Sequence, residues 1–285
     1  IKPFTLAVAL ESEKFKVTTP IDTSPGYIRL DKKTIVDPKN YGVLSMGDVL
    51  IKSSQVGTTK IALSVEIDQL RGMLSRAGFG EFCATGFPGE QVGYLPHQRR
   101  WLPLQRAALS FGHGMSVNVV QLARAYLAIA ADGMKKPVSL LRTDVHAKTV
   151  GSDREERVMQ IATARQLRET MTQVVERGTG TSAKIDGYSV AGKTGTTHNV
   201  GATGYEDNRY RATFAGMVPA DNPKYVAVVT IDDPKGMGYY GGEVAAPIFA
   251  KVMKDVLRLR NVPPDRPQQL GKHYVKASVF SSSSG

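Results

Sequence analysis

The chain contains one cysteine, Cys83, among 285 residues. A lone cysteine excludes any disulfide within the chain, so the fold has to rest on its core and its hydrogen bonds. We expect Cys83 to pack in the interior rather than to react. The five histidines lack the spacing of metal ligands, and no residue pattern indicates a metal or another cofactor.

Long apolar runs are also missing from the sequence. No stretch reaches the roughly 18 residues that a membrane-spanning helix needs, and no signal peptide is visible at the start. The chain opens on Ile1 without a methionine, inside a segment that resembles a helix. We therefore expect an upstream part of the protein to precede Ile1.

Acidic residues are in deficit, with 26 Asp and Glu against 37 Lys and Arg, which gives a formal net charge of +11. This balance favours anionic partners such as acidic lipid, an anionic polymer or nucleic acid. No basic run exceeds two residues, and basic and aromatic residues do not interleave. We therefore do not expect nucleic acid as a partner. The hydrophobic content of 41% is that of an ordinary globular domain with an ample core.

Apolar residues with helical spacing, and the capping residues beside them, predict several helices. The expected helices cover residues 2–11, 48–52, 56–65, 68–77, 116–131, 163–177 and 244–259. Residues 15–40 hold turn residues between short β-rich pieces and are expected to form an extended hairpin or lid-like region. Residues 78–115, rich in Gly, Pro and aromatic residues, are expected to form the long irregular rim of a functional site.

Runs rich in β-forming residues follow in the last third of the chain. Residues 188–191 alternate, and two further runs cover residues 211–218 and 225–231, which predicts neighbouring strands of an antiparallel sheet. Because Pro263 and Pro264 follow the last helix, we divide the chain into a domain of residues 1–262 and a loose C-terminal tail of residues 263–285.

The stretch Lys193-Thr194-Gly195-Thr196 follows the first of these strands. Successive side chains of a strand point to opposite faces, so Lys193 and Gly195 share one face and the two threonines the other. Gly195 leaves the backbone open to another molecule. A cation, hydroxyls and a bare backbone edge suit an extended peptide that ends in a carboxylate. Alone, the stretch also fits an ordinary strand end with a surface lysine.

Two further segments offer acid–base groups. Lys2 lies in the first turn of an apolar helix, where burial would lower its pKa and suit it to act as a general base; a lysine that extends to solvent is the alternative. Lys52-Ser53-Ser54-Gln55 lies at the junction of two helices. There a hydroxyl followed two residues later by an amide can relay a proton and hold a peptide carbonyl, whereas either serine could instead cap the next helix.

The order of these groups resembles the signature of β-lactamases and penicillin-binding proteins, in which a Ser-x-x-Lys, a serine–amide motif and Lys-Thr-Gly follow one another. The chain is similar to the transpeptidase domain of class B penicillin-binding proteins of the division type. The stretches that carry the resemblance are residues 1–5, 52–57, 86–90, 93–96, 110–116, 121–126 and 192–196. It implies an α/β fold of the α+β type, with an antiparallel five-stranded sheet flanked by helices.

The resemblance also implies catalytic roles. The nucleophilic serine would lie three positions before Lys2, upstream of Ile1 and outside the given chain. Lys2 would take its proton, and Ser53 would pass a proton to the leaving D-Ala amine. Lys193 would supply positive potential to the site.

Other motif residues would bind the substrate, a stem peptide of peptidoglycan. The residues expected to bind it are Ser54, Gln55, Thr194, Gly195, Thr196, Tyr239 and Tyr240. The hydroxyls of Thr194 and Thr196 would hold the terminal carboxylate, and the backbone N–H of Thr196, with that of the serine, would form the oxyanion hole. Tyr239 and Tyr240 would form an aromatic wall, or else pack within a loop.

One position departs from the family pattern, because Gln55 stands where asparagine is usual. The extra methylene moves the amide head, which affects the expected contact to the substrate carbonyl and to some β-lactams. Two other functions stay open on the same fold. One is a serine hydrolase, either a β-lactamase or a D,D-carboxypeptidase. A class A β-lactamase would need a glutamate to activate water, and Glu90 is the candidate, although it better fits a structural turn carboxylate. A non-enzymatic β-lactam sensor or scaffold is the other alternative.

The cellular setting that the resemblance implies is septal wall synthesis. A D,D-transpeptidase of this kind forms peptidoglycan cross-links through an acyl-serine enzyme and is the target of β-lactams. An anchor helix and a pedestal domain, both absent from this chain, would hold the catalytic domain in the periplasm at the inner membrane. Its partners would be a membrane glycan polymerase and division proteins.

Overall fold

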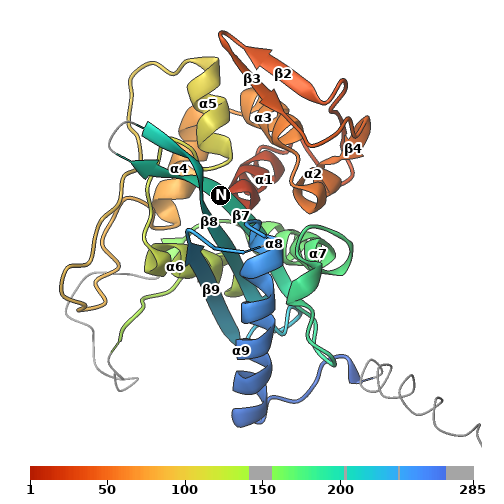
Figure 1. Cartoon of the computed structure of the whole chain (residues 1–285), viewed down its shortest axis with the longest axis vertical. Coiled ribbons are helices and arrows are strands. Elements are labelled where there is room, and N and C mark those ends of the chain that lie inside the picture. Colours follow the sequence, from red (N-terminus) through yellow and green to blue (C-terminus); the bar gives the residue numbers. More distant parts are fainter. Residues whose placement is uncertain (141–155, 202–203, 237, 268–285) are drawn as a thin grey trace, which may run out of the picture.

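The computed structural model describes residues 1–140, 156–201, 204–236 and 238–267. Its centre is an antiparallel sheet of strands β7 (Ala191–Gly201), β8 (Gly204–Val218) and β9 (Tyr225–Asp232), in that order. Helix α9 (Ala246–Leu259) packs on one face of this sheet, and helices α6 (Val119–Ala130) and α7 (Ile161–Arg177) cover the other (Figure 1).

Alternation along β8 explains why both faces of the sheet are covered. Ala215 and Met217 are buried in the larger core with α6 and α7, whereas Phe214 and Val218 join Phe249 of α9 in a smaller core. Successive strand residues point to opposite faces. One strand therefore contributes to two hydrophobic cores.

The predicted α/β fold, with an antiparallel sheet flanked by helices, is confirmed. The strand count differs, since three strands form the main sheet in the described residues, whereas the resemblance implied five. The other strands pair locally, β1 (Pro20–Asp22) with β4 (Val43–Ser45), β2 (Tyr27–Leu30) with β3 (Lys33–Val36), and β5 (Met134–Lys135) with β6 (Glu156–Arg157).

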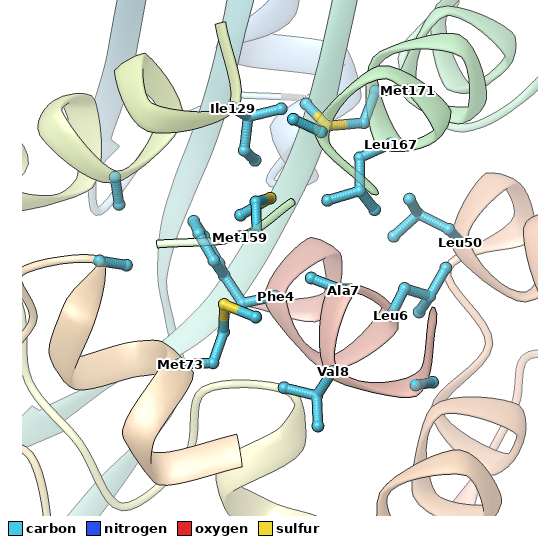
Figure 2. Packing of buried hydrophobic residues seen from close by; sticks show 14 of the residues in the cluster. Phe4, Leu6, Ala7, Val8, Leu50, Met73, Ile129, Met159, Leu167 and Met171 are labelled. Carbon is cyan, nitrogen blue, oxygen red and sulfur yellow. The ribbon is translucent and has the colours of Figure 1, made fainter. Parts of the chain in front are cut away.

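Helix α1 (Lys2–Glu11) lies inside the larger core, with neighbours on several sides (Figure 2). Phe4 packs edge-on against Phe79, with ring centroids 5.5 Å apart, and against Tyr126 at 6.2 Å. A helix that is apolar all round is buried rather than amphipathic. Pro3 occupies the first turn, where its missing N–H has no intrahelical partner to lose. The packing fixes the position of Lys2 at the start of this helix.

The segment predicted to be an extended hairpin forms a small lobe of paired strands. The β2–β3 hairpin projects from the body (Figure 1), and β4 leads directly into helix α2 (Met46–Lys52). The Ser45 hydroxyl caps α2 by accepting a hydrogen bond from the N–H of Asp48 at 3.0 Å. Helix α3 (Gln55–Ser64) follows after two residues. The lobe therefore borders the junction of α2 and α3.

Several predicted element limits were wrong. Asn118 rather than Ser116 caps α6: Asn118 accepts from the N–H of Gln121 at 2.8 Å, and the Gln121 side chain accepts from the N–H of Asn118 at 3.0 Å. Helix α7 begins before Thr163. The region predicted to be irregular contains helix α5 (Pro103–Ser110). The remaining helices are α4 (Ile67–Arg76), the 3₁₀ turn η1 (Thr181–Ala183) and α8 (Gly241–Val244).

The folded part of the chain extends beyond Pro264. The Asp265 carboxylate accepts from the N–H of Ser189 at 2.9 Å, and Arg266 forms an ion pair with Glu176 at 2.7 Å. The start of the predicted tail is therefore bound to the body, and residues 268–285 lie outside the described residues. Within the described part of the chain, no helix combines the length and apolar character needed to span a membrane.

Candidate active site

A cavity of about 790 Å³ opens between the start of α1, the α2–α3 junction, β7 and the segment that enters α8. Predicted site residues that line it are Lys2, Ser53, Gln55, Lys193, Thr194, Gly195, Thr196, Tyr239 and Tyr240. Ser54 and Glu90 do not line it. The structure thus brings together groups from four segments that are far apart in the sequence.

Lys2, Ser53 and Lys193 line one part of the cavity, which we call its floor, and Ser53 lies between the two lysines. Its Oγ accepts hydrogen bonds from Nζ of Lys2 at 2.9 Å and from Nζ of Lys193 at 3.0 Å. Lys2 also donates to the Ser53 carbonyl at 2.6 Å. Because both lysines donate to Oγ, the Ser53 hydroxyl proton is left to point toward another acceptor. This arrangement can pass a proton between either lysine and a molecule in the cavity.

Burial changes the acid–base chemistry of both lysines. It lowers the pKa of Lys2 from 10.5 to about 8, and the nearby negative charge of Asp37 opposes that shift. Burial also lowers the pKa of Lys193 well below its usual range, and repulsion from Lys2 adds to the effect. Lys193 is only 5% exposed. Both amines can therefore exchange protons closer to neutral pH than an exposed lysine can.

The turn between α2 and α3 places Ser53 in an unusual backbone conformation. Ser53 is the C-cap of α2 with φ 58° and ψ 33°, in the left-handed region that non-glycine residues rarely adopt. The neighbouring residue, Ser54, is fully buried and begins α3. Such a conformation persists only where the surroundings hold it.

Ser54 has a structural contact instead of the predicted substrate contact. Its hydroxyl accepts from the N–H of Gly57 at 2.8 Å and donates to a carboxylate oxygen of Asp37 at 2.5 Å. With its proton committed to Asp37 and its position fully buried, the hydroxyl does not reach the cavity. The alternative reading of Ser54 as a helix cap describes the structure.

Thr194 and Thr196 of β7 form hydrogen bonds with two other segments that line the cavity. The Thr194 hydroxyl lies 2.7 Å from the Thr179 hydroxyl and accepts from Nζ of Lys193 at 3.2 Å. The Thr196 hydroxyl accepts from the N–H of Gly241 at 3.0 Å. Each hydroxyl can still donate its proton, so the pair offers donors to an anion.

Glycines allow these segments to approach closely. A Cβ on Gly241 would lie 2.5 Å from the carbonyl oxygen of Gly195, and one on Gly242 would lie 2.3 Å from that of Thr179. A side chain at Gly241 would push α8 away from β7, and one at Gly242 would push it away from Thr179, which follows α7. The glycines therefore keep the threonine hydroxyls next to the cavity.

Aromatic rings form the outer wall of the cavity. Tyr210 stacks on Tyr239 with ring centroids 4.2 Å apart, and Tyr239 lies 4.4 Å from Tyr240. His198 packs against Tyr210 at 4.7 Å. Across the cavity, burial lowers the pKa of His113, with smaller contributions from the charges of His198 and Lys2. Tyr239 and Tyr240 thus belong to a continuous aromatic surface and not to a buried loop.

Gln55 is exposed at the cavity edge and belongs to the first turn of α3. Its backbone N–H donates to Asp37 at 2.5 Å, so its main chain is fixed while its side chain faces the cavity. The amide head is therefore placed to contact a bound molecule.

Glu90 has a structural role outside the cavity. Its carboxylate accepts hydrogen bonds from the backbone N–H of Cys83 and, at 3.2 Å, from that of Thr85, whose hydroxyl also donates at 2.9 Å. Burial alone would raise the pKa of Glu90, but these hydrogen bonds outweigh burial and keep the pKa below its usual range. Glu90 closes a turn, as its simpler interpretation predicted, and Cys83 is buried as expected.

Residues at or behind the cavity that the sequence did not predict include Asp37, His113, Thr179 and His198. Asp37 stands in an Asp-Pro pair, which signals only a turn. Thr179 follows a helix-ending glycine, and the two histidines have no spacing that relates them. Their role depends on contacts across the fold. No group of three or more His, Cys, Asp or Glu that could hold a metal ion occurs in the described residues.

Comparison with known proteins identifies relatives of this chain. It matches the family described as the penicillin binding protein transpeptidase domain over residues 1–254. It is 40% identical over 269 residues to the probable peptidoglycan D,D-transpeptidase PbpC of Pseudomonas aeruginosa, covering 94% of this chain and 46% of that protein. It is 37% identical over 266 residues to the peptidoglycan D,D-transpeptidase FtsI of Escherichia coli K12, covering 93% and 44%.

The fold agrees with a solved structure. The transpeptidase domain of penicillin-binding protein 3 from Burkholderia pseudomallei, in its apo form, superposes with a TM-score of 0.86 and 38% identity, over 93% of this chain and 80% of that one. The chain spans about half the length of the curated relatives it matches. It belongs to the penicillin-binding protein transpeptidase family, in the class B division of that family.

Proposed function

We propose that this chain is the catalytic domain of a peptidoglycan D,D-transpeptidase, which cross-links stem peptides through an acyl-serine intermediate. The observation that carries the proposal is the convergence on Ser53. Two lysines, 51 and 140 residues away in the sequence, place their amines 2.9 and 3.0 Å from its Oγ. Because the pKa of each lysine is lowered, the cluster suits proton transfer.

The proposed nucleophile is a serine two positions before Ile1, one helical turn ahead of Lys2 and on the same face. Lys2 in its neutral form accepts the serine proton as Oγ attacks the carbonyl carbon between the two terminal D-Ala residues. The negative charge that develops on the carbonyl oxygen is held by the backbone N–H groups of the serine and Thr196.

Collapse of this intermediate breaks the peptide bond and needs a proton on the leaving nitrogen. Ser53 gives its hydroxyl proton to that nitrogen and is reprotonated by Lys2, so D-Ala leaves as an amine and Lys2 returns to its neutral form. An amine from a second stem peptide then attacks the acyl-serine and loses its proton through the same groups. The cross-link forms, and the serine recovers its hydrogen.

Binding of the substrate carboxylate is assigned to Lys193, Thr194 and Thr196. The threonine hydroxyls accept from Lys193 and from the N–H of Gly241, and with Thr179 as the donor to Thr194 both threonine protons are left for an anion. A β-lactam presents a carboxylate at a similar distance from its reactive carbonyl, and it would acylate the same serine. The hydrolase alternative has no support at Glu90, whose carboxylate is held by the backbone outside the cavity.

The setting that we propose is the periplasmic side of an inner membrane, with an anchor upstream of this chain. A membrane glycan polymerase and division proteins would be the partners in septal wall synthesis. The net charge of +11 fits work beside anionic lipid and a lipid-linked precursor.

The test is the fate of a labelled penicillin on the full-length protein. We expect a covalent adduct that lasts for hours, because Glu90, the glutamate that a class A β-lactamase would use to activate water, is held outside the cavity. Turnover within seconds would instead identify a hydrolase. The absence of any adduct would favour a non-enzymatic scaffold.

A further inference from the structure

A buried carboxylate lies directly behind the catalytic floor. Asp37 follows strand β3 and is only 4% exposed. One of its oxygens accepts from the backbone N–H groups of Gln55 at 2.5 Å and Val56 at 3.2 Å, and the other accepts from the Ser54 hydroxyl at 2.5 Å. Asp37 therefore binds three consecutive residues at the start of α3.

These bonds complete the cap of α3. The first N–H groups of a helix have no partner within the helix, and the helix start carries partial positive charge. A carboxylate there is stabilising on both counts, and its hydrogen bonds are stronger than those of a neutral cap. The Ser54 hydroxyl accepts a hydrogen bond from the N–H of Gly57, and the Asp37 carboxylate accepts from the N–H groups of Gln55 and Val56. The two caps together fix the first turn of α3.

Ser53 is the residue immediately before this fixed turn. Its left-handed backbone (φ 58°, ψ 33°) lies between the end of α2 and the start of α3. A non-glycine residue relaxes from this region unless both sides are held. The end of α2 is held by backbone hydrogen bonds from Ser53 to the Leu50 carbonyl at 3.1 Å and from Ser54 to the Val49 carbonyl at 2.9 Å, and Asp37 holds the other side.

We propose that Asp37 is a positioning residue that, through the start of α3, keeps the Ser53 hydroxyl between Lys2 and Lys193. The inference rests on the proposed transpeptidase function, for which Ser53 is the proton relay. Asp37 does not line the cavity, although Pro38 beside it does. Its backbone N–H donates to Gly26 at 2.9 Å, so the β2–β3 hairpin lobe is tied to the catalytic floor at this residue.

The charge of Asp37 acts on the floor as well. It raises the pKa of Lys2 against the larger effect of burial. The other charged groups that act on this region are Lys193 on β7 and His113 after α5, and their pKa values are themselves lowered in part by the charge of Lys2. Asp37 is the negative partner that limits how far the pKa of Lys2 falls.

The experiment compares Asp37→Asn, Asp37→Glu and a control, Asp22→Asn, in the full-length protein. Asp22 lies in the same lobe and is exposed; its carboxylate accepts from the N–H of the nearby Ser24 at 2.8 Å, and its contact with α3 is made by its backbone carbonyl, which accepts from Lys60, so the substitution leaves that contact in place. The measurement is the rate of acylation by a labelled penicillin between pH 6 and about pH 10, a window that brackets the lowered pKa of Lys2.

For Asp37→Asn we expect a loss on the order of tenfold or more in the plateau rate, because one charged cap of the relay turn is removed. We also expect the midpoint of the acidic limb to move to lower pH, since Lys2 loses its negative neighbour. Asp37→Glu keeps the charge but displaces it, so its rate should fall with little change in midpoint. Asp22→Asn should match the unmodified protein in both respects.

Two results would overturn the inference: wild-type kinetics in Asp37→Asn, or a lower rate with an unmoved midpoint, which would reveal a purely structural role. Hydrogen exchange gives a readout apart from activity. The amides of Gln55 and Val56 should exchange faster in Asp37→Asn than in Asp22→Asn, and equal rates would contradict the proposed contact. If the unmodified protein itself forms no adduct, the proposed function fails, while the exchange result still tests Asp37.

Discussion

The floor of the cavity, formed by Lys2, Ser53 and Lys193, differs in burial from its rim, the outer aromatic wall of Tyr210, Tyr239 and Tyr240. On the floor, Lys193 is 5% exposed and meets Ser53 and Lys2 in a cluster with lowered lysine pKa values. At the rim, Tyr240 is 52% exposed. Burial changes the free energy of a charge far more than that of an aromatic ring. We therefore propose that bonds are made and broken at the floor, where Lys193 also meets the substrate carboxylate, and that the rim adds aromatic contact to the substrate.

From this difference between floor and rim, we expect the largest loss of acylation rate on substitution of Lys193. Lys193→Ala removes both the cation beside the substrate carboxylate and one hydrogen bond that holds the Ser53 hydroxyl. Acylation of the full-length protein by a labelled penicillin should fall by about a thousandfold or more. The fold should persist, because a buried amine is not required by the core.

Lys184→Ala is the matched control for that variant. Lys184 is also a lysine near the α7–β7 connection, but it is half exposed and pairs with Glu176 outside the cavity. Its acylation rate should stay at the wild-type level. Unchanged acylation in Lys193→Ala would remove that lysine from the mechanism and end the distinction between floor and rim.

The second prediction concerns pH. A general base must be neutral, and the pKa of Lys2 is lowered to about 8. The acylation rate should therefore fall by about tenfold for each pH unit below that value and level off above it. A profile that is flat between pH 6 and pH 9 would show that Lys2 does not accept the proton.

Gln55 lies between the two regions, and its substitution should have a smaller effect. Gln55→Asn shortens the amide arm at the cavity edge without disturbing the backbone bond to Asp37. We expect acylation rates to change by about two- to tenfold, in a direction that differs between β-lactams. Rates across a β-lactam panel measure this effect, and identical rates would show that the longer side chain is neutral.

The smallest effect is expected at the rim. Tyr240→Ala removes an exposed ring while leaving Tyr239 stacked on Tyr210. Stem-peptide binding should weaken by about two- to fivefold, with the rate of the bound complex unchanged. Separate measurement of KM and kcat checks this, and a loss confined to kcat would place Tyr240 with the floor.

The sequence predicted much of this molecule because its motifs are local. Lys2, Ser53 and Lys193 each stand in a short pattern with a fixed spacing, and the order of the patterns indicated one family. The apolar α1 was predictable for the same reason, since an all-round apolar helix has to be buried.

What the sequence missed depends on contacts between distant segments. Ser54 was predicted to bind substrate, whereas its hydroxyl donates a hydrogen bond to Asp37, 17 residues away in the sequence. Thr179, which follows α7, meets Thr194 of β7, and Gly242 of α8 packs against the Thr179 carbonyl. Helix starts were misplaced where Asn118 offered a reciprocal cap that outcompetes Ser116. These hydrogen-bond partners and helix limits depend on contacts between distant segments, so they cannot be predicted from one segment alone.

The central claim is that the floor built by Lys2, Ser53 and Lys193 activates a serine one helical turn before Lys2. Mass spectrometry of the full-length protein after incubation with penicillin tests it most directly. We expect one adduct per chain, on the serine two positions before Ile1. An adduct on any other residue, or a different residue at that position, would contradict it.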